Sequence, residues 1–124
     1  NSAYRLLKAY TPGAYTFILT ATAEVPRRLM HPRRKTIGLR VPNHTVAQAL
    51  LAELGEPIMS TSLILPGEAE PLIDIHEIRE RLDRSVDLII DSGSCGLEAT
   101  TVIDLVDGAV EVARVGKGDP TPFR

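Results

Sequence analysis

The 124 residues of this chain predict a single domain with one hydrophobic core. Apolar residues make up 44% and charged residues 24% of the sequence, a globular composition that argues against disorder. A single cysteine excludes a disulfide-stabilised scaffold, and no apolar run approaches the roughly 18 residues of a transmembrane helix. The charge is uneven, because residues 1–60 carry a formal net charge of +5 and residues 61–124 one of −7.

In the first half of the chain, turn signals and apolar periodicity predict four elements after an N-terminal helical segment. Residues 1–10 have helical spacing, and Thr11-Pro12-Gly13 stops them. Alternating aromatic and β-branched residues then predict a strand over 15–22. The other elements are a short helix over 24–32, a strand over 36–41, and a helix to Leu54 that Asn43 or Thr45 caps and Gly55 ends.

In the second half, strands and one helix are predicted. Asp74 and Glu77 have the spacing of a capping box at the start of a helix over 74–82. Asp107-Gly108 predicts a hairpin turn. The predicted strands cover residues 57–65, 86–91, 100–106 and 109–115, and a polar tail follows. About six strands and three helices in this order favour an α/β fold, with a twisted sheet of mixed parallel and antiparallel strands and flanking helices.

Common catalytic and cofactor-binding signatures are missing from the sequence. It contains no GxxxxGK[ST] loop, no GxGxxG, no HExxH and no paired CxxC. The three histidines lie far apart without a carboxylate at metal-ligand spacing, so no metal site is predicted. Cys95 lies in a predicted loop over 92–98, and a catalytic thiol there would need a base that the sequence does not identify.

One basic stretch stands out between residues 27 and 40, where six cationic side chains occur without an acidic one. Guanidinium groups pair bidentately with phosphates, so the stretch suits a nucleotide or RNA. Tyrosine and phenylalanine residues precede it and could stack on bases. A solvated face is the alternative interpretation. The six predicted RNA- or phosphate-binding residues are Arg27, Arg28, Arg33, Arg34, Lys35 and Arg40.

Hydroxyl side chains cluster at two other places. Ser60-Thr61-Ser62 lies within a predicted strand, and Thr100-Thr101 follows the glycine-containing loop. Hydroxyls and backbone amides at strand ends can bind a small anion, but they can equally bond their own neighbours. By themselves these residues indicate no more than a possible phosphate site.

Taken in order, six segments followed by Arg114 resemble motifs of the YrdC/YciO family. Residues 86–93, for example, resemble VDxIxDGG, and residues 36–42 resemble T-[IV]-G-x-R-x-P. The remaining matches are 11–19 with PGxxTxIL, the helix over 43–54, 57–67 with P-x-x-x-T-S-A-N-x-S-G, and 100–104 with S-T-V-[VI]-D. The P-G ending of the 57–67 segment and the R-K-T-I-G-L-R-V-P run resemble the YciO branch most.

This resemblance implies a function in transfer RNA modification. YrdC-type members make L-threonylcarbamoyladenylate from ATP, L-threonine and bicarbonate, so the resemblance implies ATP as a substrate, accompanied by Mg²⁺, and no tightly bound cofactor. Structured RNA or transfer RNA is the implied partner, no membrane is involved, and the implied location is the cytoplasm. Carried over by position, the nucleotide-binding residues are Thr61, Ser62, Thr100, Thr101 and Arg114.

Two departures from the family pattern bear on activity. Ile64 stands where the family has asparagine, and the family's Lys-x-Arg motif has no match in the first 60 residues. Because the chain begins at Asn1 and enters mid-pattern, we expect it to be the C-terminal two-thirds of one YrdC-like domain and to be inactive alone. Three functions stay open: a synthase-like enzyme, a nucleotide- or RNA-binding module without catalysis, and an accessory domain for carbamoyl transfer.

Overall fold

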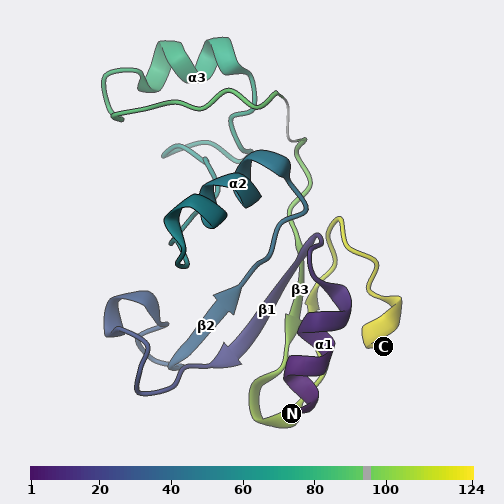
Figure 1. Ribbon diagram of the computed structural model, residues 1–124. Helices are drawn as coiled ribbons and strands as arrows, with labels where there is room; N and C mark the ends of the chain where they lie inside the picture. Colours follow the sequence, from purple (N-terminus) through teal and green to yellow (C-terminus); the bar gives the residue numbers. More distant parts are fainter. Residues whose placement is uncertain (94–95) are drawn as a thin grey trace. The chain divides into compact units, whose positions relative to one another are not determined.

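The structure, a computed structural model, describes residues 1–93 and 96–124 (Figure 1). The chain divides into two compact units. The first consists of Asn1–Pro57 and Glu98–Arg124, and the second of Ile58–Leu97. Ser94 and Cys95 lie outside the described residues, so the role of Cys95, which the sequence left open, is not addressed by the structure.

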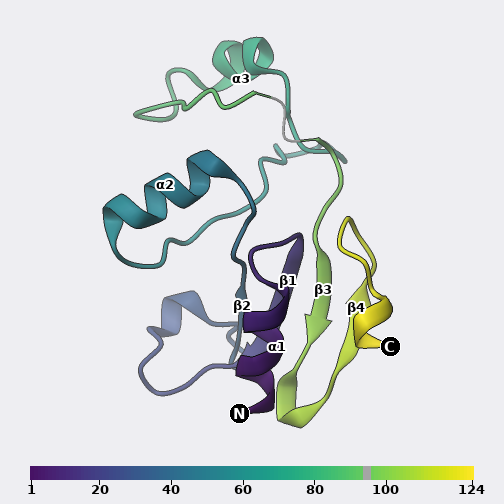
Figure 2. The ribbon, with the colours of Figure 1, turned by 45° about the vertical axis from the view of Figure 1, so that its right-hand side comes forward.

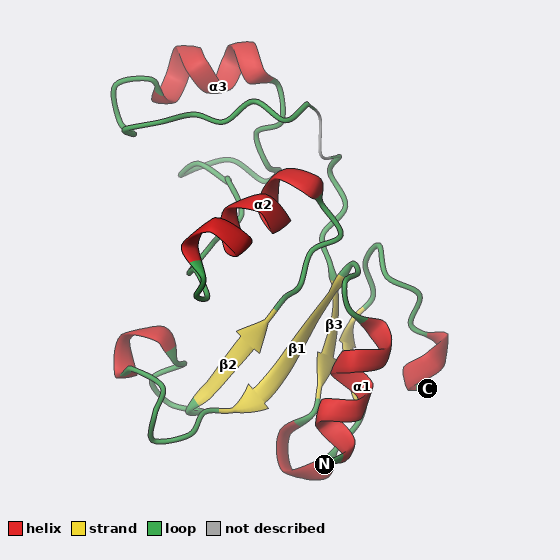
Figure 3. Ribbon diagram, viewed as in Figure 1, coloured by secondary structure: helices red, strands yellow, loops and turns green. Residues whose placement is uncertain are grey.

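The first unit contains a four-stranded sheet in the order β2-β1-β3-β4 (yellow in Figure 3). Its strands are β1 (Tyr15–Thr20), β2 (Thr36–Leu39), β3 (Thr101–Asp104) and β4 (Glu111–Arg114). The neighbouring strands β1 and β3 run parallel, whereas β1 is antiparallel to β2 and β3 is antiparallel to β4. The predicted mixed sheet is therefore confirmed, and it joins strands from the two ends of the chain.

A tight turn joins β3 to β4 (Figure 2). Asp107 and Gly108 have φ values of 56° and 76°, and the Ala109 N–H donates to the Val106 carbonyl at 3.1 Å. Two successive residues with positive φ are what a type I′ hairpin turn requires. The hairpin predicted from Asp107-Gly108 is confirmed.

The hydrophobic core of the first unit lies on one face of the sheet. Phe17 and Ile103 are paired in β1 and β3 and are fully buried. Helix α1 (Ser2–Tyr10) packs on them through its apolar side chains. Phe123, from the tail predicted only to be polar, is also buried, and its ring centroid lies 4.9 Å from that of Tyr10. An aromatic cluster therefore holds the C-terminal segment on the core.

Helix caps partly follow the predictions. Helix α2 (Thr45–Leu54) ends at Gly55 as predicted, but its N-cap is His44, whose Nδ1 accepts from the Ala47 N–H at 3.2 Å. The prediction of Asn43 or Thr45 as the cap was wrong by one residue. Asp74 caps helix α3 (Ile75–Leu82) as predicted, but through the His76 N–H at 2.9 Å.

Three predicted elements are wrong. The helix over 24–32 is reduced to the single 3₁₀ turn Arg27–Leu29, because Pro26 and Pro32 leave room for no more. Residues 57–65 and 86–91 form no strand, although their sequences are apolar and partly β-branched. A strand needs a neighbour that pairs with it residue after residue, whereas the described residues supply only isolated bonds, such as that from the Leu72 N–H to the Leu63 carbonyl at 2.8 Å.

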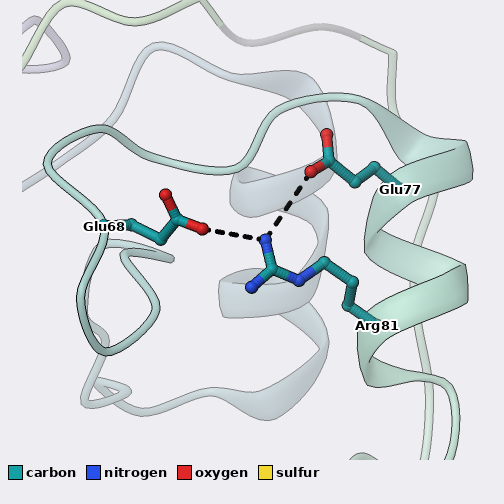
Figure 4. Close-up of polar contacts among 3 residues, drawn as sticks. All are labelled: Glu68, Glu77 and Arg81. Atoms are coloured by element: carbon teal, nitrogen blue, oxygen red, sulfur yellow. Dashed lines mark hydrogen bonds and ion pairs between the residues drawn. The ribbon is translucent and has the colours of Figure 1, made fainter.

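The second unit contains α3 and extended segments. The Arg81 guanidinium links α3 to a preceding turn, with its Nη1 3.1 Å from Glu68 Oε1 and 3.6 Å from Glu77 Oε1 (Figure 4). Glu77 is thus paired with Arg81 one helical turn away. None of the described residues of this unit is buried. In the part of the chain that the structure describes, no helix is long and apolar enough to cross a membrane.

Candidate functional site

Polar residues gather on the face of the sheet opposite the core, where β1 and β3 begin. Thr16 Oγ1 and Thr100 Oγ1 lie 2.7 Å apart. Arg114 lies beside them and donates to the Thr100 carbonyl from Nε at 3.1 Å and from Nη2 at 2.8 Å, and to Thr100 Oγ1 from Nη2 at 3.2 Å. We call Thr16, Thr100 and Arg114 the hydroxyl–arginine cluster.

Strand register explains why these three residues meet. Val102 in β3 is the partner of Thr16 in β1 and of Arg114 in β4. Thr100 precedes Val102 by two residues, so its side chain lies on the same face and diagonal to both. The core residues Phe17 and Ile103 alternate with this set and lie on the opposite face.

The cluster leaves one end of an exposed guanidinium available. The bonds to Thr100 orient Arg114 and use its Nε and Nη2 groups, whereas Nη1 has no partner among the described residues. Gly38 in β2 borders the cluster, because a Cβ added there would lie 3.2 Å from Thr16 Cγ2. An oriented arginine beside two hydroxyls is suited to binding an anionic oxygen. The arrangement contains no nucleophile and base pair of the kind that covalent catalysis needs.

Thr101 has a different environment from Thr100. It is fully buried, and its hydroxyl donates to the Gly118 carbonyl at 2.5 Å and accepts from the Gly116 N–H at 2.9 Å. This hydroxyl therefore ties the start of β3 to the chain that follows β4. A side chain at Gly116 would collide with the Ala99 carbonyl, so the close approach requires glycine. A contact between Thr101 and a nucleotide stays a prediction.

Thr61 and Ser62 belong to the second unit. Both are exposed, and neither hydroxyl has a hydrogen-bond partner among the described residues. The Ser62 carbonyl accepts from the Ile64 N–H at 3.0 Å, which turns the chain locally. The predicted nucleotide-binding residues are thus divided between the two units. Within the first unit, the structure brings Thr100 and Arg114 together.

The six predicted phosphate-binding cations lie in the connection between β1 and β2 and just after it. Arg27 and Arg28 are in the 3₁₀ turn, and Arg40 follows β2. The remaining three, Arg33, Arg34 and Lys35, lie in a tight turn directly before β2. All six are exposed, and none forms an ion pair with a carboxylate in the described ranges.

His31 organises this tight turn, a role that the sequence reasoning missed. Its Nδ1 accepts the backbone N–H groups of Arg33 at 3.2 Å and Arg34 at 3.1 Å. Its carbonyl accepts from the Lys35 N–H at 2.9 Å, and Lys35 has a positive φ of 55°. We call residues 31–35 the basic turn, and four of them line a shallow hollow of about 430 Å³. The sequence signal for this role was a histidine two residues before Arg33. Asparagine and aspartate side chains at that position accept backbone N–H groups of a turn in the same way.

One carboxylate near the C-terminus has a shifted pKa. Hydrogen bonds from the backbone and side chain of Thr121 hold the pKa of Asp119 below its ordinary value. The Asp119 carbonyl also accepts from the Tyr15 hydroxyl at 3.0 Å. Asp119 therefore helps to hold the C-terminal segment in place. Among the residues that the structure describes, no three histidine, cysteine, aspartate or glutamate side chains group to hold a metal ion.

Comparison with known proteins identifies the family. The family model for Sua5, YciO and YrdC proteins, described as "Telomere recombination", matches residues 1–116. The chain belongs to this family. The resemblance seen in the sequence is thereby confirmed.

Relatives of this family differ in what is known of them. The uncharacterised protein YciO of Escherichia coli is 57% identical over 123 residues, which are 99% of this chain and 60% of YciO. The crystal structure of E. coli YciO superposes on the whole chain with a TM-score of 0.90 and 56% identity, and the chain covers 60% of it. This chain therefore spans about 60% of the length of that relative.

More distant relatives carry functional names. The threonylcarbamoyl-AMP synthase of Bacillus subtilis is 31% identical over 117 residues, which are 94% of this chain and 34% of that protein. The crystal structure of P. abyssi Sua5 complexed with L-threonine has a TM-score of 0.78 and 29% identity, and the match covers 93% of this chain and 34% of Sua5. The solved structures of YciO and Sua5 confirm the predicted fold class.

Proposed function

We propose that this protein binds an adenine nucleotide through the hydroxyl–arginine cluster, in a site related to that of the threonylcarbamoyl-AMP synthases. The observation that carries the proposal is the orientation of Arg114, whose guanidinium donates three hydrogen bonds to Thr100. Its Nη1 group has no hydrogen-bond partner among the described residues and is available to a ligand. The 31% identity to the B. subtilis synthase supports an ATP-related ligand. A contact of Thr61 or Ser62 with the nucleotide stays a prediction from the family resemblance.

The chemistry of such a synthase needs little from the protein beyond positioning. A carbamate oxygen derived from threonine and bicarbonate attacks the α-phosphorus of ATP, and the bond from that phosphorus to pyrophosphate breaks. Two anions must be held together while charge develops on phosphate oxygens, which an oriented arginine and hydroxyl donors favour. The Mg²⁺ that accompanies ATP would offset further charge.

Ile64 leads us to propose weak or no synthase activity for this chain. It stands where the family has asparagine, and a hydrocarbon side chain cannot form the hydrogen bonds of an amide. The chain also spans only about 60% of E. coli YciO. In a pyrophosphate-release assay with ATP, L-threonine and bicarbonate, we expect no turnover by the 124-residue chain. Sustained turnover would contradict the proposed importance of the asparagine.

Nucleotide binding is tested by calorimetric titration with ATP and Mg²⁺. Arg114→Ala removes the guanidinium, and we expect it to weaken binding by at least tenfold, because a hydrogen bond to a charged group contributes about 1.5–3 kcal/mol. Arg5→Ala is the matched control, since Arg5 is exposed on α1, and it should change affinity less than twofold. If ATP does not bind, or if both variants bind as the unchanged chain does, the proposal fails.

A second candidate function, binding of structured RNA, rests on the basic turn. Its cations are exposed and without carboxylate partners in the described residues, so phosphate groups could approach them. Charge reversal of Arg33, Arg34 and Lys35 to glutamate should weaken binding of a transfer RNA at least tenfold and flatten its salt dependence. Reversal of Arg5, Arg79 and Arg84 is the matched control. Equal effects of the two triple variants would indicate nonspecific charge attraction and would contradict a dedicated surface.

A further inference from the structure

Two of the three histidines accept backbone hydrogen bonds through the same ring nitrogen. In the basic turn, His31 Nδ1 accepts from the Arg33 and Arg34 N–H groups at 3.2 and 3.1 Å. At the start of α2, His44 Nδ1 accepts from the Ala47 N–H at 3.2 Å. An imidazole nitrogen accepts only when it carries no proton, and a charged imidazole donates from both nitrogens. These bonds therefore require two neutral rings, each with its proton on Nε2. We call His31 and His44 the histidine pair.

The histidine pair stands at the two ends of β2. His31 lies five residues before Thr36, where β2 begins, and its backbone N–H donates to the Thr36 carbonyl at 2.8 Å. His44 lies five residues after the last residue of β2 and caps α2. In the first turn of α2, Gln48 Nε2 donates to the Pro42 carbonyl at 2.7 Å, which ties the capped helix to the chain that leaves β2. Each ring thus orders the chain that enters or leaves this strand.

Strand β2 contributes to both candidate surfaces of the first unit. Its residue Gly38 borders the hydroxyl–arginine cluster, and the basic turn leads directly into it. It pairs with β1 over only four residue pairs, from Phe17–Leu39 to Thr20–Thr36. Short elements open from their ends, so the pairing of β2 depends on the order of the chain on either side.

The surroundings of the histidine pair are electropositive. Neither ring forms an ion pair in the described residues, and Glu24 is the one carboxylate among residues 1–52. His44 follows Arg40 and lies at the N-terminus of α2, which carries partial positive charge and has no acidic residue in its first turn. The 11–14 segment, which bonds residue 41, contains no charged side chain. The cations on either side of His31 are Arg27 and Arg28 in the 3₁₀ turn and Arg33, Arg34 and Lys35 in the basic turn.

We propose that the histidine pair is an acid-sensitive switch, in which protonation of His31 and His44 loosens both ends of β2 and disorders the basic turn. A proton on Nδ1 replaces an acceptor with a donor that faces the N–H groups it had bound, so the ring turns away and those bonds are lost. Histidine is the side chain whose charge ordinarily changes between pH 5 and 8. The ordering is therefore present while the rings are neutral and is lost as pH falls. The switch is a property of the fold and does not depend on either proposed ligand.

Amide hydrogen exchange, followed residue by residue by NMR, tests the switch. Acidification from about pH 7.5 to about pH 5.5 should lower the protection of the Arg33, Arg34 and Ala47 amides and of the paired amides of β2 at least fivefold. Protection is corrected for the intrinsic dependence of exchange on pH. The amides that pair β1 with β3 should keep their protection. Asp119 does not contribute to the difference, because its pKa lies below its ordinary value and the carboxylate stays charged over this range.

Three asparagine variants make the test specific. Asparagine accepts backbone N–H groups in turns and at helix N-caps but does not titrate. His31→Asn should abolish the acid-induced loss of protection at Arg33 and Arg34 and leave the loss at Ala47, whereas His44→Asn should do the reverse. The double variant should keep β2 protected at about pH 5.5. His76→Asn is the matched control, since the His76 ring is exposed and has no hydrogen-bond partner in the described residues, and it should change neither response.

Imidazole ¹⁵N chemical shifts of the unchanged chain provide a measurement that needs no variant. At about pH 7.5, Nδ1 of both His31 and His44 should have the shift of an unprotonated acceptor. A proton on Nδ1 of either ring at that pH would overturn the proposal. Full protection of β2 in the unchanged chain at about pH 5.5 would overturn it as well. So would a loss of protection that persists in the double variant, because other titrating groups would then be its cause.

Discussion

Replacing Thr101 by valine separates a structural role of this residue from a ligand-binding one. Valine has nearly the same shape as threonine but lacks the hydroxyl, which joins the Gly118 carbonyl and the Gly116 N–H in a fully buried position. The substitution leaves one acceptor and one donor without a partner, at a cost of about 1–3 kcal/mol for each group. Because Gly116 is partly exposed and can regain water, we expect a total loss of about 2–4 kcal/mol in the free energy of unfolding.

Tyrosine fluorescence during urea unfolding measures this loss. All three tyrosines lie in the first unit, so their signal reports on the unit that contains Thr101. Thr101→Ser keeps the hydroxyl and removes one methyl group, so it should cost only about 1 kcal/mol. The reasoning is refuted if Thr101→Val changes the free energy of unfolding by less than about 0.5 kcal/mol. A variant that keeps its stability but loses ATP binding would instead place Thr101 in the ligand site.

Three further variants test other contacts. Phe123→Ala removes the ring that packs on Tyr10 at 4.9 Å between centroids, and it should lower the free energy of unfolding of the first unit by about 3–5 kcal/mol in the same urea assay. His31→Ala removes the acceptor that orders the basic turn and should weaken transfer RNA binding several-fold, whereas His31→Asn, which keeps an acceptor, should restore it; equal affinities would contradict the ordering role. Because the pKa of Asp119 is lower in the folded chain than in the unfolded chain, its contribution to stability is present above the ordinary pKa and is lost as pH falls through the folded one. Asp119→Asn should therefore reduce the acid dependence of the melting temperature below about pH 4, and an unchanged pH profile would contradict this assignment.

Local sequence signals predicted those elements whose stabilising contacts are local. Asp107-Gly108 specified its hairpin because two residues with positive φ suffice to reverse the chain. Gly55 ended α2 because glycine readily adopts the left-handed conformation in which a helix stops. The family motifs also led to the correct family and fold class, since their order along the chain is itself a sequence property.

The predicted strands over 57–65 and 86–91 failed because a strand depends on a partner that no local pattern supplies. Their apolar alternation is present in the sequence, but backbone pairing requires a second chain segment at the right place. The cap of α2 was misassigned by one residue because histidine can accept through Nδ1 and stands outside the usual capping types. In the sequence, Thr100 and Thr101 were equally strong candidates for nucleotide binding, and nothing in it distinguished their different roles.

The sequence by itself determined the family, the mixed α/β class, the cationic stretch over residues 27–40 and the identity of the hydroxyl and arginine residues. Tertiary structure alone decided which of these residues meet. The parallel pairing of β1 with β3, across more than 80 residues of chain, puts Thr16 beside Thr100, and the antiparallel pairing of β4 adds Arg114. Because side chains alternate along each strand, this register also sends Thr101 into the core and Thr100 to the opposite face. Register depends on contacts between distant segments, so it appears only when the chain is folded.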